Sequence, residues 1–428
     1  MARNRVLFNK HLEYIFRLVL NLILKYPGPA SIKATRAVSL VCWLLLLCSC
    51  TTTRRLNPPG VPAEISFNQG AGRGDFILVT LRLENGDALP FVIDTGCIHT
   101  ILDQSLDSKL GRRTGVKTLN YGWYGKVRSN IYKTPKLYLG NLGLLMDDQV
   151  FTDDLEKKFP GQSIKGILGM DCLEHYCIQL DFTAGKMRFL DPGCAGDMDL
   201  GRSYPLTVFR GCIFCHADFF GAGKAYFRPD TGGIGDYDAV FKPGLFQREL
   251  RQQTPALIGQ SDTDPGKSRK MALFLKGTFG GDGYTNMTFI EWEGIDWSAR
   301  NIIGLQFLAR NLVTFNFPKR TMYLKQASIG PLAPGYFLTL EAGKFLLDLK
   351  AKNQLPGFPK NDVGQAHMPE AVHGHVYPIS ATFDVRKKDN KSIYHYTVSQ
   401  PSRDGVWKLL RAWQSDTDGH IINEFSLP

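Results

Sequence analysis

The sequence predicts a mainly β protein made of two similar lobes in tandem, followed by a small α+β domain. Two observations predict the lobes. The tripeptide Asp-Thr-Gly occurs at 94–96 and again at 230–232. Each occurrence is followed later in the chain by a second motif, two apolar residues and a Gly. The third observation is a change in the spacing of apolar residues after residue 326, where a helical pattern is followed by alternating, strand-like runs. A chain of 428 residues is long enough for two or three domains.

The duplication rests on two spacings that agree. The segments Ile167-Leu168-Gly169 and Ile302-Ile303-Gly304 align without a gap at an offset of 135, and the two Asp residues are 136 apart. In each half the Gly follows the Asp-Thr-Gly by about 75 residues. One internal repeat explains both spacings and predicts lobes at 63–193 and 194–326.

Each Asp-Thr-Gly follows a segment that resembles a strand. In the first lobe the apolar run 91–93 is typical of a buried strand, and Asp94 stands at its end. A carboxylate delivered out of an apolar strand is costly unless it is hydrogen-bonded or used. Upstream, a strand over 76–83 and an Asn-Gly turn at 84–87 predict a hairpin, which 216–220 and 221–224 repeat before Asp230.

Two glycine-containing segments lie between the motifs. Residues 118–127 place aromatic residues, among them Tyr121 and Tyr124, between glycines, which suits the tip of a hairpin. Packing of these rings under a loop is the alternative. The Gly-rich segment 277–284 is expected at the equivalent place in the second lobe, and it lacks the following helix that a phosphate-binding loop requires.

The N-terminal segment has the layout of a secretory leader. Lys33 and Arg36 precede the apolar run 37–47, and small residues follow. The end of this run resembles a bacterial lipobox, with Cys50 as the lipidated residue. A plain signal peptide and an uncleaved anchor are the alternatives. We therefore expect a leader over 1–49, a Pro-rich tether over 50–62 and a periplasmic, lipid-anchored protein attached to the bacterial membrane through Cys50.

The C-terminal region reads as a separate module. A linker is expected at 327–335, then a domain over 336–428 with a helix at 340–352 and strands near 382–386, 392–398 and 406–413. This pattern faintly resembles the cystatin-like and nuclear-transport-factor-like folds, in which a helix packs on a curved sheet. The pattern carries no activity of its own.

The charge of the chain argues against nucleic-acid binding. The net charge is +11, but seven Lys and Arg and a single Glu lie in residues 1–50, so the leader holds more than half of it. The remainder is only mildly basic and has no recognition motif.

The two Asp-Thr-Gly turns, each followed by the apolar-apolar-Gly element, resemble the pepsin and retropepsin superfamily of aspartic peptidases over roughly residues 63–326. The single-chain, two-lobed plan resembles pepsin, and the sequence motif Ile-Leu-Gly-Met-Asp-Cys-Leu at 167–173 resembles retropepsin-like bacterial proteins. The resemblance implies two β-barrel lobes of the acid protease kind and a polypeptide substrate. It implies no cofactor and no metal.

The resemblance also implies the roles of particular residues. Asp94 and Asp230 would form the catalytic pair, and a tyrosine at 121 or 124 would lie in a flap that closes over the peptide. The supporting residues would be Thr95, Gly96, Thr231 and Gly232. Two nearby carboxylates that share one proton can activate a water and polarise a carbonyl, and their titration belongs to the pair.

The sequence departs from the family around these turns. The residue after Asp-Thr-Gly is usually Ser, Thr or Ala, and a hydroxyl there can donate to the carboxylate; here it is Cys97 and Gly233. Arg228 stands where an apolar residue is expected and, by strand alternation, points to the same side as Asp230. An ion pair between them would favour the alternative of a peptide-binding lipoprotein that does not cut.

The cysteines leave further alternatives open. Cys212, Cys215 and His216 match the pattern of c-type haem attachment, although they fall on an expected strand. Cys194 is a candidate disulfide partner of Cys212 or Cys215. Cys97, beside Asp94, raises the idea of a thiol nucleophile, for which no histidine is placed as the base.

Overall fold

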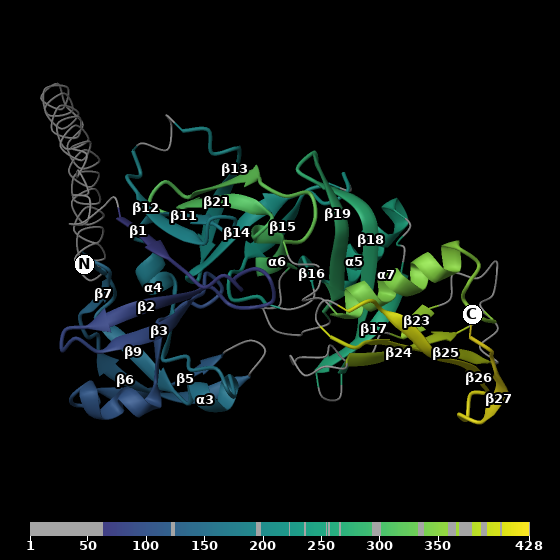
Figure 1. The fold of residues 1–428 in the computed structure, drawn as a ribbon. Coiled ribbons are helices and arrows are strands. Elements are labelled where there is room, and N and C mark those ends of the chain that lie inside the picture. The colour runs from purple at the N-terminus through teal and green to yellow at the C-terminus, as the bar shows by residue number, and fades with distance from the viewer. Residues whose placement is uncertain are drawn as a thin grey trace, which may run out of the picture. The chain divides into compact units, whose positions relative to one another are not determined.

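The computed structural model describes residues 63–120, 125–193, 198–221, 223–234, 237–253, 255, 257–264, 267–292, 301–332, 338–357, 365–367, 379–386, 392–402 and 405–427. These residues form a mainly β structure with three sheets of nine, thirteen and five strands (Figure 1). The expected leader, the tether with Cys50, the two tyrosines of the expected flap and Cys194 lie outside the described residues.

The nine-stranded sheet belongs to the first half of the chain, in the order β5-β6-β9-β4-β10-β3-β2-β7-β8. Its strands are β2 (Leu78–Leu83), β3 (Ala88–Ile93), β4 (Ile101–Asp103), β5 (Gly115–Asn120), β6 (Lys126–Lys133), β7 (Leu137–Leu139), β8 (Leu142–Gly143), β9 (Gln149–Asp153) and β10 (Gly166–Leu168).

The thirteen-stranded sheet combines strands of both halves, in the order β1-β12-β11-β21-β22-β13-β14-β15-β20-β16-β19-β18-β17. Its strands are β1 (Ala63–Ser66), β11 (Cys177–Asp181), β12 (Lys186–Leu190), β13 (Arg202–Phe209), β14 (Cys212–Ala217), β15 (Ala225–Pro229), β16 (Ala239–Phe241), β17 (Leu257–Asp264), β18 (Lys267–Phe279), β19 (Asp282–Glu291), β20 (Asn301–Ile303), β21 (Asn311–Asn316) and β22 (Thr321–Gln326).

Among the described residues, helices are few and mostly short. They are the 3-10 helix η1 (Gln104–Lys109) and the α-helices α3 (Leu155–Lys158), α4 (Met170–Leu173), α5 (Pro243–Gln252), α6 (Leu305–Leu308) and α7 (Leu338–Ala351). No described helix has both the length and the apolar character needed to cross a membrane.

The strand order repeats, as the sequence duplication predicts. The order β5-β6-β9-β4-β10-β3-β2 matches β17-β18-β19-β16-β20-β15-β14 strand for strand. The parallel pairs repeat as well: β3 with β10 corresponds to β15 with β20, and β4 with β9 corresponds to β16 with β19. We call residues 63–190 the first copy and residues 202–326 the second copy.

The two copies meet in the middle of the thirteen-stranded sheet. β11 of the first copy pairs antiparallel with β21 of the second, from Cys177 opposite Asn316 to Asp181 opposite Leu312. Each of these strands also pairs with the next strand of its own copy, β12 or β22. The expected β-barrels are not confirmed, because each sheet is open, with two different strands at its edges.

Sequence alternation explains the strands that border the site. β2 has alternating buried and exposed side chains, which is typical of a strand with one face on the core, whereas β3 is continuously buried over its last three residues. Gly86, with φ of +94°, makes the turn between them possible, and Leu83 N donates to Asp87 O across it. The predicted hairpin is confirmed.

The Gly-rich segment 277–284 is not where the sequence analysis expected it. It forms the turn of the β18–β19 hairpin, with Gly280 and Gly281 at positive φ. In the repeated strand order this hairpin corresponds to the connection between β6 and β9, not to the β5–β6 hairpin. The counterpart of the β5–β6 hairpin is β17–β18. The prediction failed because the spacing of glycines does not reveal which strands they join.

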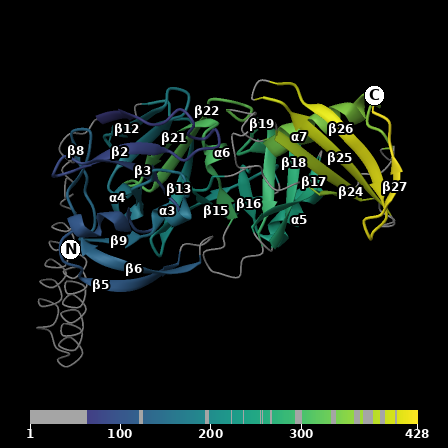
Figure 2. The ribbon, with the colours of Figure 1, turned by 60° about the horizontal axis from the view of Figure 1, so that its bottom comes forward.

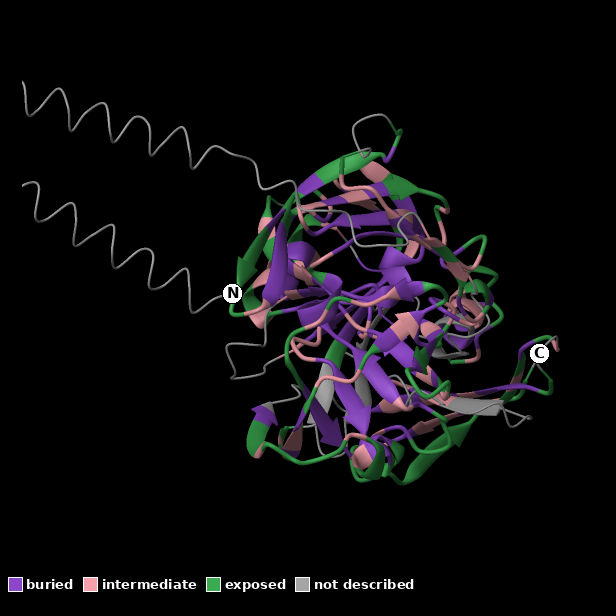
Figure 3. Cartoon of the chain, turned by 90° about the vertical axis from the view of Figure 1, so that its left-hand side faces the viewer, coloured by how far each residue is buried: buried purple, intermediate pink, exposed green. Residues whose placement is uncertain are grey.

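A continuous apolar core supports the site (Figure 3). In the second copy Phe219 lies at its centre, with ring centroids 4.7 to 5.6 Å from five neighbours. These neighbours are Phe227, Phe241, Phe279, Phe289 and Phe307. Because Phe227 lies on β15, this packing holds the strand that carries Asp230.

The C-terminal α+β prediction matches the structure in helix and sheet. α7 covers a five-stranded sheet of β23 (Gln365–His367), β24 (Ile379–Arg386), β25 (Ile393–Gln400), β26 (Lys408–Ser415) and β27 (Ile421–Glu424) (Figure 2). Buried residues of α7, such as Leu346, share a core with Phe383 and Tyr396 of the sheet. The boundaries of the three expected domains stay predictions.

Candidate active site

Two parallel strand pairs deliver the two Asp-Thr-Gly turns. β3 ends at Ile93 and β15 ends at Pro229, so each strand stops directly before its aspartate. Asp94 N donates to Leu168 O at the end of β10, and Asp230 N donates to Ile303 O at the end of β20. The apolar-apolar-Gly elements therefore fix the start of each turn from the neighbouring strand.

Four reciprocal hydrogen bonds join the two turns. Thr95 N donates to Thr231 Oγ1 at 2.9 Å, and Thr231 N donates to Thr95 Oγ1 at 3.0 Å. The hydroxyls in turn donate across the junction, Thr95 to Pro229 O and Thr231 to Ile93 O. Both threonines are fully buried, so these bonds are shielded from water and tie the copies together where the aspartates emerge.

The carboxylates of Asp94 and Asp230 converge at this junction. A Cβ added at Gly96 would lie 2.3 Å from Oδ1 of Asp230, and one added at Gly232 would lie 2.3 Å from Cγ of Asp94. Each glycine therefore leaves the space that the opposite carboxylate occupies, which any other residue would fill. The structure brings together the two aspartates and four supporting residues that the sequence analysis named.

Backbone donors hold the inner oxygen of each carboxylate. Oδ1 of Asp94 accepts from Gly96 N at 2.7 Å and from Cys97 N at 3.1 Å, and Oδ1 of Asp230 accepts from Gly232 N at 3.1 Å. Burial and the negative charge of Asp230 raise the pKa of Asp94 to about 7, because they outweigh these hydrogen bonds and the nearby Arg228. The pair therefore favours a form in which one carboxyl keeps its proton.

Arg228 forms the ion pair that the strand alternation anticipated. Its Nη2 lies 2.7 Å from Oδ2 of Asp230, and both side chains are largely buried, at 13% and 7% exposure. Its Nε is buried and has no hydrogen-bond partner among the described residues. The expectation that this residue faces Asp230 is confirmed.

Cys97 does not donate to its neighbouring carboxylate. Its Sγ donates to His99 O at 3.1 Å, and burial, reinforced by the charge of Asp94, raises the pKa of the thiol well above its usual value. The His99 ring instead packs at a tilt against Phe151, with ring centroids 4.7 Å apart. A protonated thiol that donates to a carbonyl is a poor nucleophile, so this geometry gives the thiol-nucleophile idea no support.

Sequence reasoning missed a buried ion pair behind the second turn. Arg310 and Asp238 are both fully buried and lie 2.8 Å apart, and Asp238 also accepts from Thr288 N. Burial raises the pKa of Asp238 to about 6 despite this partner. Asp238 and Arg310 lie 72 residues apart, so no local sequence pattern joins them. The one available sign was a charged residue, Arg310, next to an apolar segment.

The strands on either side of the expected flap are confirmed. β5 and β6 pair antiparallel from Gly115 opposite Ile131 to Asn120 opposite Lys126, so the two strands form a hairpin. Tyr121 and Tyr124 fall between these strands in the sequence and lie outside the described residues. Their role stays a prediction.

The haem pattern falls on a buried strand. Cys212 and Cys215 lie on β14, where residues three apart face opposite sides of the sheet. Both are nearly fully buried, and the exposed His216 ring packs at a tilt against Tyr226, with ring centroids 3.8 Å apart. This arrangement does not offer two thiols to one ligand.

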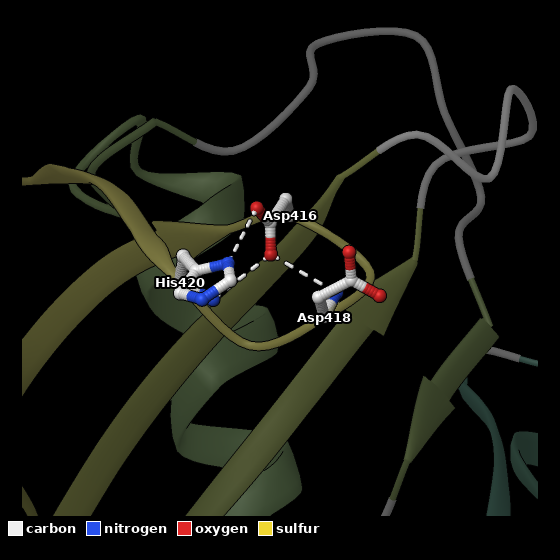
Figure 4. Close-up of side chains that lie close together, drawn as sticks. All are labelled: Asp416, Asp418 and His420. Carbon is white, nitrogen blue, oxygen red and sulfur yellow. Dashed lines mark hydrogen bonds and ion pairs between the residues drawn. The ribbon is translucent and has the colours of Figure 1, made fainter.

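One further group resembles a metal site. Within the described part of the chain, Asp416, Asp418 and His420 form the only cluster of three possible ligand residues (Figure 4). Asp416 accepts hydrogen bonds from the backbone N of Asp418 and of His420 and contacts the His420 ring at 3.1 Å. These bonds close the turn between β26 and β27, which accounts for the cluster as part of the turn.

A hydrogen-bonded chain crosses three strands of the C-terminal sheet. His395 Nδ1 lies 2.7 Å from Asp384 Oδ1, and its Nε2 lies 2.8 Å from Ser415 Oγ. Ser415 is 1% exposed and donates to Asp416 O. A hydroxyl without access to solvent cannot attack a substrate, so this row of hydrogen bonds stabilises the sheet.

The sequence comparison identifies the region that carries the first turn. Residues 79–172 match the aspartyl protease family. The matched span begins in β2 and ends in α4, so it contains Asp94 and the first apolar-apolar-Gly element. The match supports an aspartic-protease-like function, of the retropepsin-like kind, and with it a polypeptide ligand. A search of the curated proteins finds no match to this chain.

Proposed function

We propose that this protein is an aspartic endopeptidase whose catalytic residues are Asp94 and Asp230. The observation that carries the proposal is the reciprocal geometry of the two turns. Each threonine is bonded into the opposite turn, and each glycine faces the opposite carboxylate. Such convergence, built from distant segments of one chain, is what two-carboxylate hydrolysis requires.

The chemistry follows from a pair that shares one proton. The ionised carboxylate takes a proton from a water held between the two aspartates, and the water attacks the scissile carbonyl carbon. The protonated carboxyl polarises the carbonyl oxygen, and a proton then passes to the departing nitrogen. The raised pKa of Asp94 supports a pair that stays singly protonated up to near-neutral pH.

The proposed architecture is a single chain with two protease lobes and an accessory domain. The repeated strand order supports lobes at 63–193 and 194–326, each supplying one aspartate. In this proposal the connection of the β5–β6 hairpin, with Tyr121 or Tyr124, closes over the bound peptide.

The proposed location rests on the sequence alone. A leader over 1–49 directs export, and Cys50 is lipidated and anchors the protein in the periplasm through the tether. Radiolabelled palmitate should be incorporated into the wild-type chain and lost on Cys50→Ser.

A second candidate function is peptide binding without cleavage, and the Arg228–Asp230 ion pair favours it. A guanidinium on one outer carboxylate oxygen competes with the water that hydrolysis needs. The peptidase is the stronger candidate because hydrolysis requires one ionised carboxylate, and an ion pair retains that charge instead of removing it.

Cleavage of a mixed peptide library separates the two candidates. The full chain in detergent is assayed from about pH 3 to pH 8, beside Asp94→Asn, Asp230→Asn and the matched control Asp148→Asn, an exposed carboxylate elsewhere in the first copy. The peptidase proposal expects the first two variants to lose more than about a thousandfold in rate and the control to lose nothing. Saturable binding without cleavage by any of the four proteins supports the binder, and equal cleavage by all four excludes this pair as catalytic.

A further inference from the structure

The residue that corresponds to Arg228 in the first copy is apolar. Val92 pairs with Ile167 across β3 and β10, and Arg228 pairs with Ile302 across β15 and β20. Both stand two residues before their aspartate, but Val92 is 1% exposed and packs in an apolar core, whereas Arg228 reaches its aspartate. The backbone frame is the same, so the side chain alone makes the difference.

The second turn also lacks a side-chain donor after its glycine. Gly233 offers only its backbone N, which donates to Asp230 O at 3.2 Å. In the resembling peptidases a hydroxyl at this position donates to the carboxylate, and a Cβ added at Gly233 would lie 3.4 Å from Cγ of Asp230. The outer oxygen Oδ2 of Asp230 receives its hydrogen bond from Arg228 instead.

The charges around the pair balance only when one of the two carboxyls keeps its proton. The titratable and charged groups that act on Arg228 are Asp230, Asp94 and the Cys212 thiol of β14, and those that act on Asp94 are Asp230 and Arg228. With Arg228 cationic, one neutral and one ionised carboxyl give a net charge of zero, and a negative charge on Asp230 lies in direct contact with the guanidinium. Ionising Asp94 as well leaves an uncompensated negative charge, which burial disfavours.

We propose that Arg228 is a positioning residue that replaces the missing hydroxyl at Gly233 and keeps Asp230 as the ionised, water-activating member of the pair, which leaves Asp94 as the proton donor. This assignment rests on the proposed peptidase function. A charge-assisted bond from a guanidinium is stronger than one from a hydroxyl. The site therefore keeps its singly protonated form to lower pH than a pair without Arg228.

Three variants test the proposal against the wild type. Arg228→Val introduces the residue type that the first copy has at this position, and Gly233→Ser adds a hydroxyl. The double variant replaces the guanidinium donor by the hydroxyl donor. The readout is the pH profile of kcat/KM on a peptide from the library. Arg228→Val should move the acid limb of the profile upward by at least about one pH unit, which is a tenfold loss of rate on that limb. The double variant should recover part of that shift, and Gly233→Ser alone should change the profile little.

A second readout does not depend on cleavage. Thermal stability is measured from about pH 3 to pH 7 for the wild type, Arg228→Val, Asp230→Asn and the double variant of these two. Because Arg228 stabilises only the ionised form of Asp230, the deficit of Arg228→Val should grow as pH rises, and Asp230→Asn should abolish that growth.

The outcomes separate the two proposals. Active enzyme with an unshifted profile, or a uniform rise in rate on Arg228→Val at every pH, overturns the role of Arg228 and leaves the peptidase standing. Absence of cleavage together with the pH-dependent deficit overturns the peptidase, and keeps Arg228 as the partner that holds Asp230 ionised. A deficit that is independent of pH overturns the role of Arg228 in either case.

Discussion

The two copies present the same turn on the same strand frame, yet they stabilise it by different side chains. In the first copy the residue before β4 is Thr100, which donates to Asp171 at 2.6 Å and accepts from Gly169 N. In the second copy the residue before β16 is Asp238, which is paired with Arg310. The residue aligned with Asp171 is Gln306, whose side-chain amide finds no hydrogen-bond partner in the part of the chain that the structure describes.

This difference separates the interactions that both copies share, and that the fold requires, from the buried polar contacts that differ between the copies. Strand register and the threonine bonds are common to both turns and position the carboxylates. The buried charges behind and beside the turns differ, because a buried charge needs only some partner of suitable geometry. Five substitutions test the comparison, from the largest expected effect to the smallest.

Arg310→Met should give the largest loss of stability. It removes the ion-pair partner of Asp238 and leaves a fully buried carboxylate beside an apolar side chain. We expect a loss of about 3–5 kcal/mol in the free energy of unfolding, measured with urea at pH 7. Asp238→Asn added to this variant should recover part of the loss, because the amide oxygen still accepts from Thr288 N. A loss below about 1 kcal/mol would show that the second copy does not depend on its ion pair.

Thr95→Val and Thr231→Val should each cost about 1–3 kcal/mol, because each leaves buried backbone groups of the opposite copy unbonded. Thr→Ser at each position keeps the hydroxyl and serves as the control. The two losses should be equal if the bonds are as symmetric in energy as in geometry, and unequal losses in urea unfolding would contradict that symmetry.

Asp171→Asn should change how the stability of the first copy depends on pH. Burial raises the pKa of Asp171 to about 6, so its protonated form is the one that the fold favours. The stability that it contributes is complete below the unfolded pKa of about 4 and is lost as pH rises through 6. Thermal melts of wild type and variant should therefore diverge over this range in favour of the variant. Asp181→Asn, a carboxylate on β11 outside this network, is the matched control.

Cys97→Ser should have the smallest effect, below about 1 kcal/mol, since the thiol makes one weak hydrogen bond. The wild-type thiol should react slowly with a disulfide reagent at pH 7, because burial raises its pKa. Reaction as fast as that of a free thiol would contradict the raised pKa of this half-buried side chain.

The sequence predicted the parts of the fold that depend on local pattern. The offset between Gly169 and Gly304 predicted the repeat, the Asn-Gly turn predicted the hairpin before Asp94, and strand alternation predicted the contact of Arg228 with Asp230. It did not predict that Asp238 and Arg310 meet, because that contact joins segments far apart in the chain. The Gly-rich hairpin was assigned to the wrong strands for the same reason, since strand order is a property of the whole sheet.

The pairing of β11 with β21 has a consequence for any attempt to divide the gene. Expressed alone, the first copy would expose β11 as an unpaired edge of five residues, and an exposed edge strand recruits another strand. Because the native pairing is antiparallel, a second molecule of the same fragment can fill that edge about a twofold axis. A half-gene product should therefore leave a sizing column as a homodimer or aggregate, and a monomer only when a proline is placed in β11.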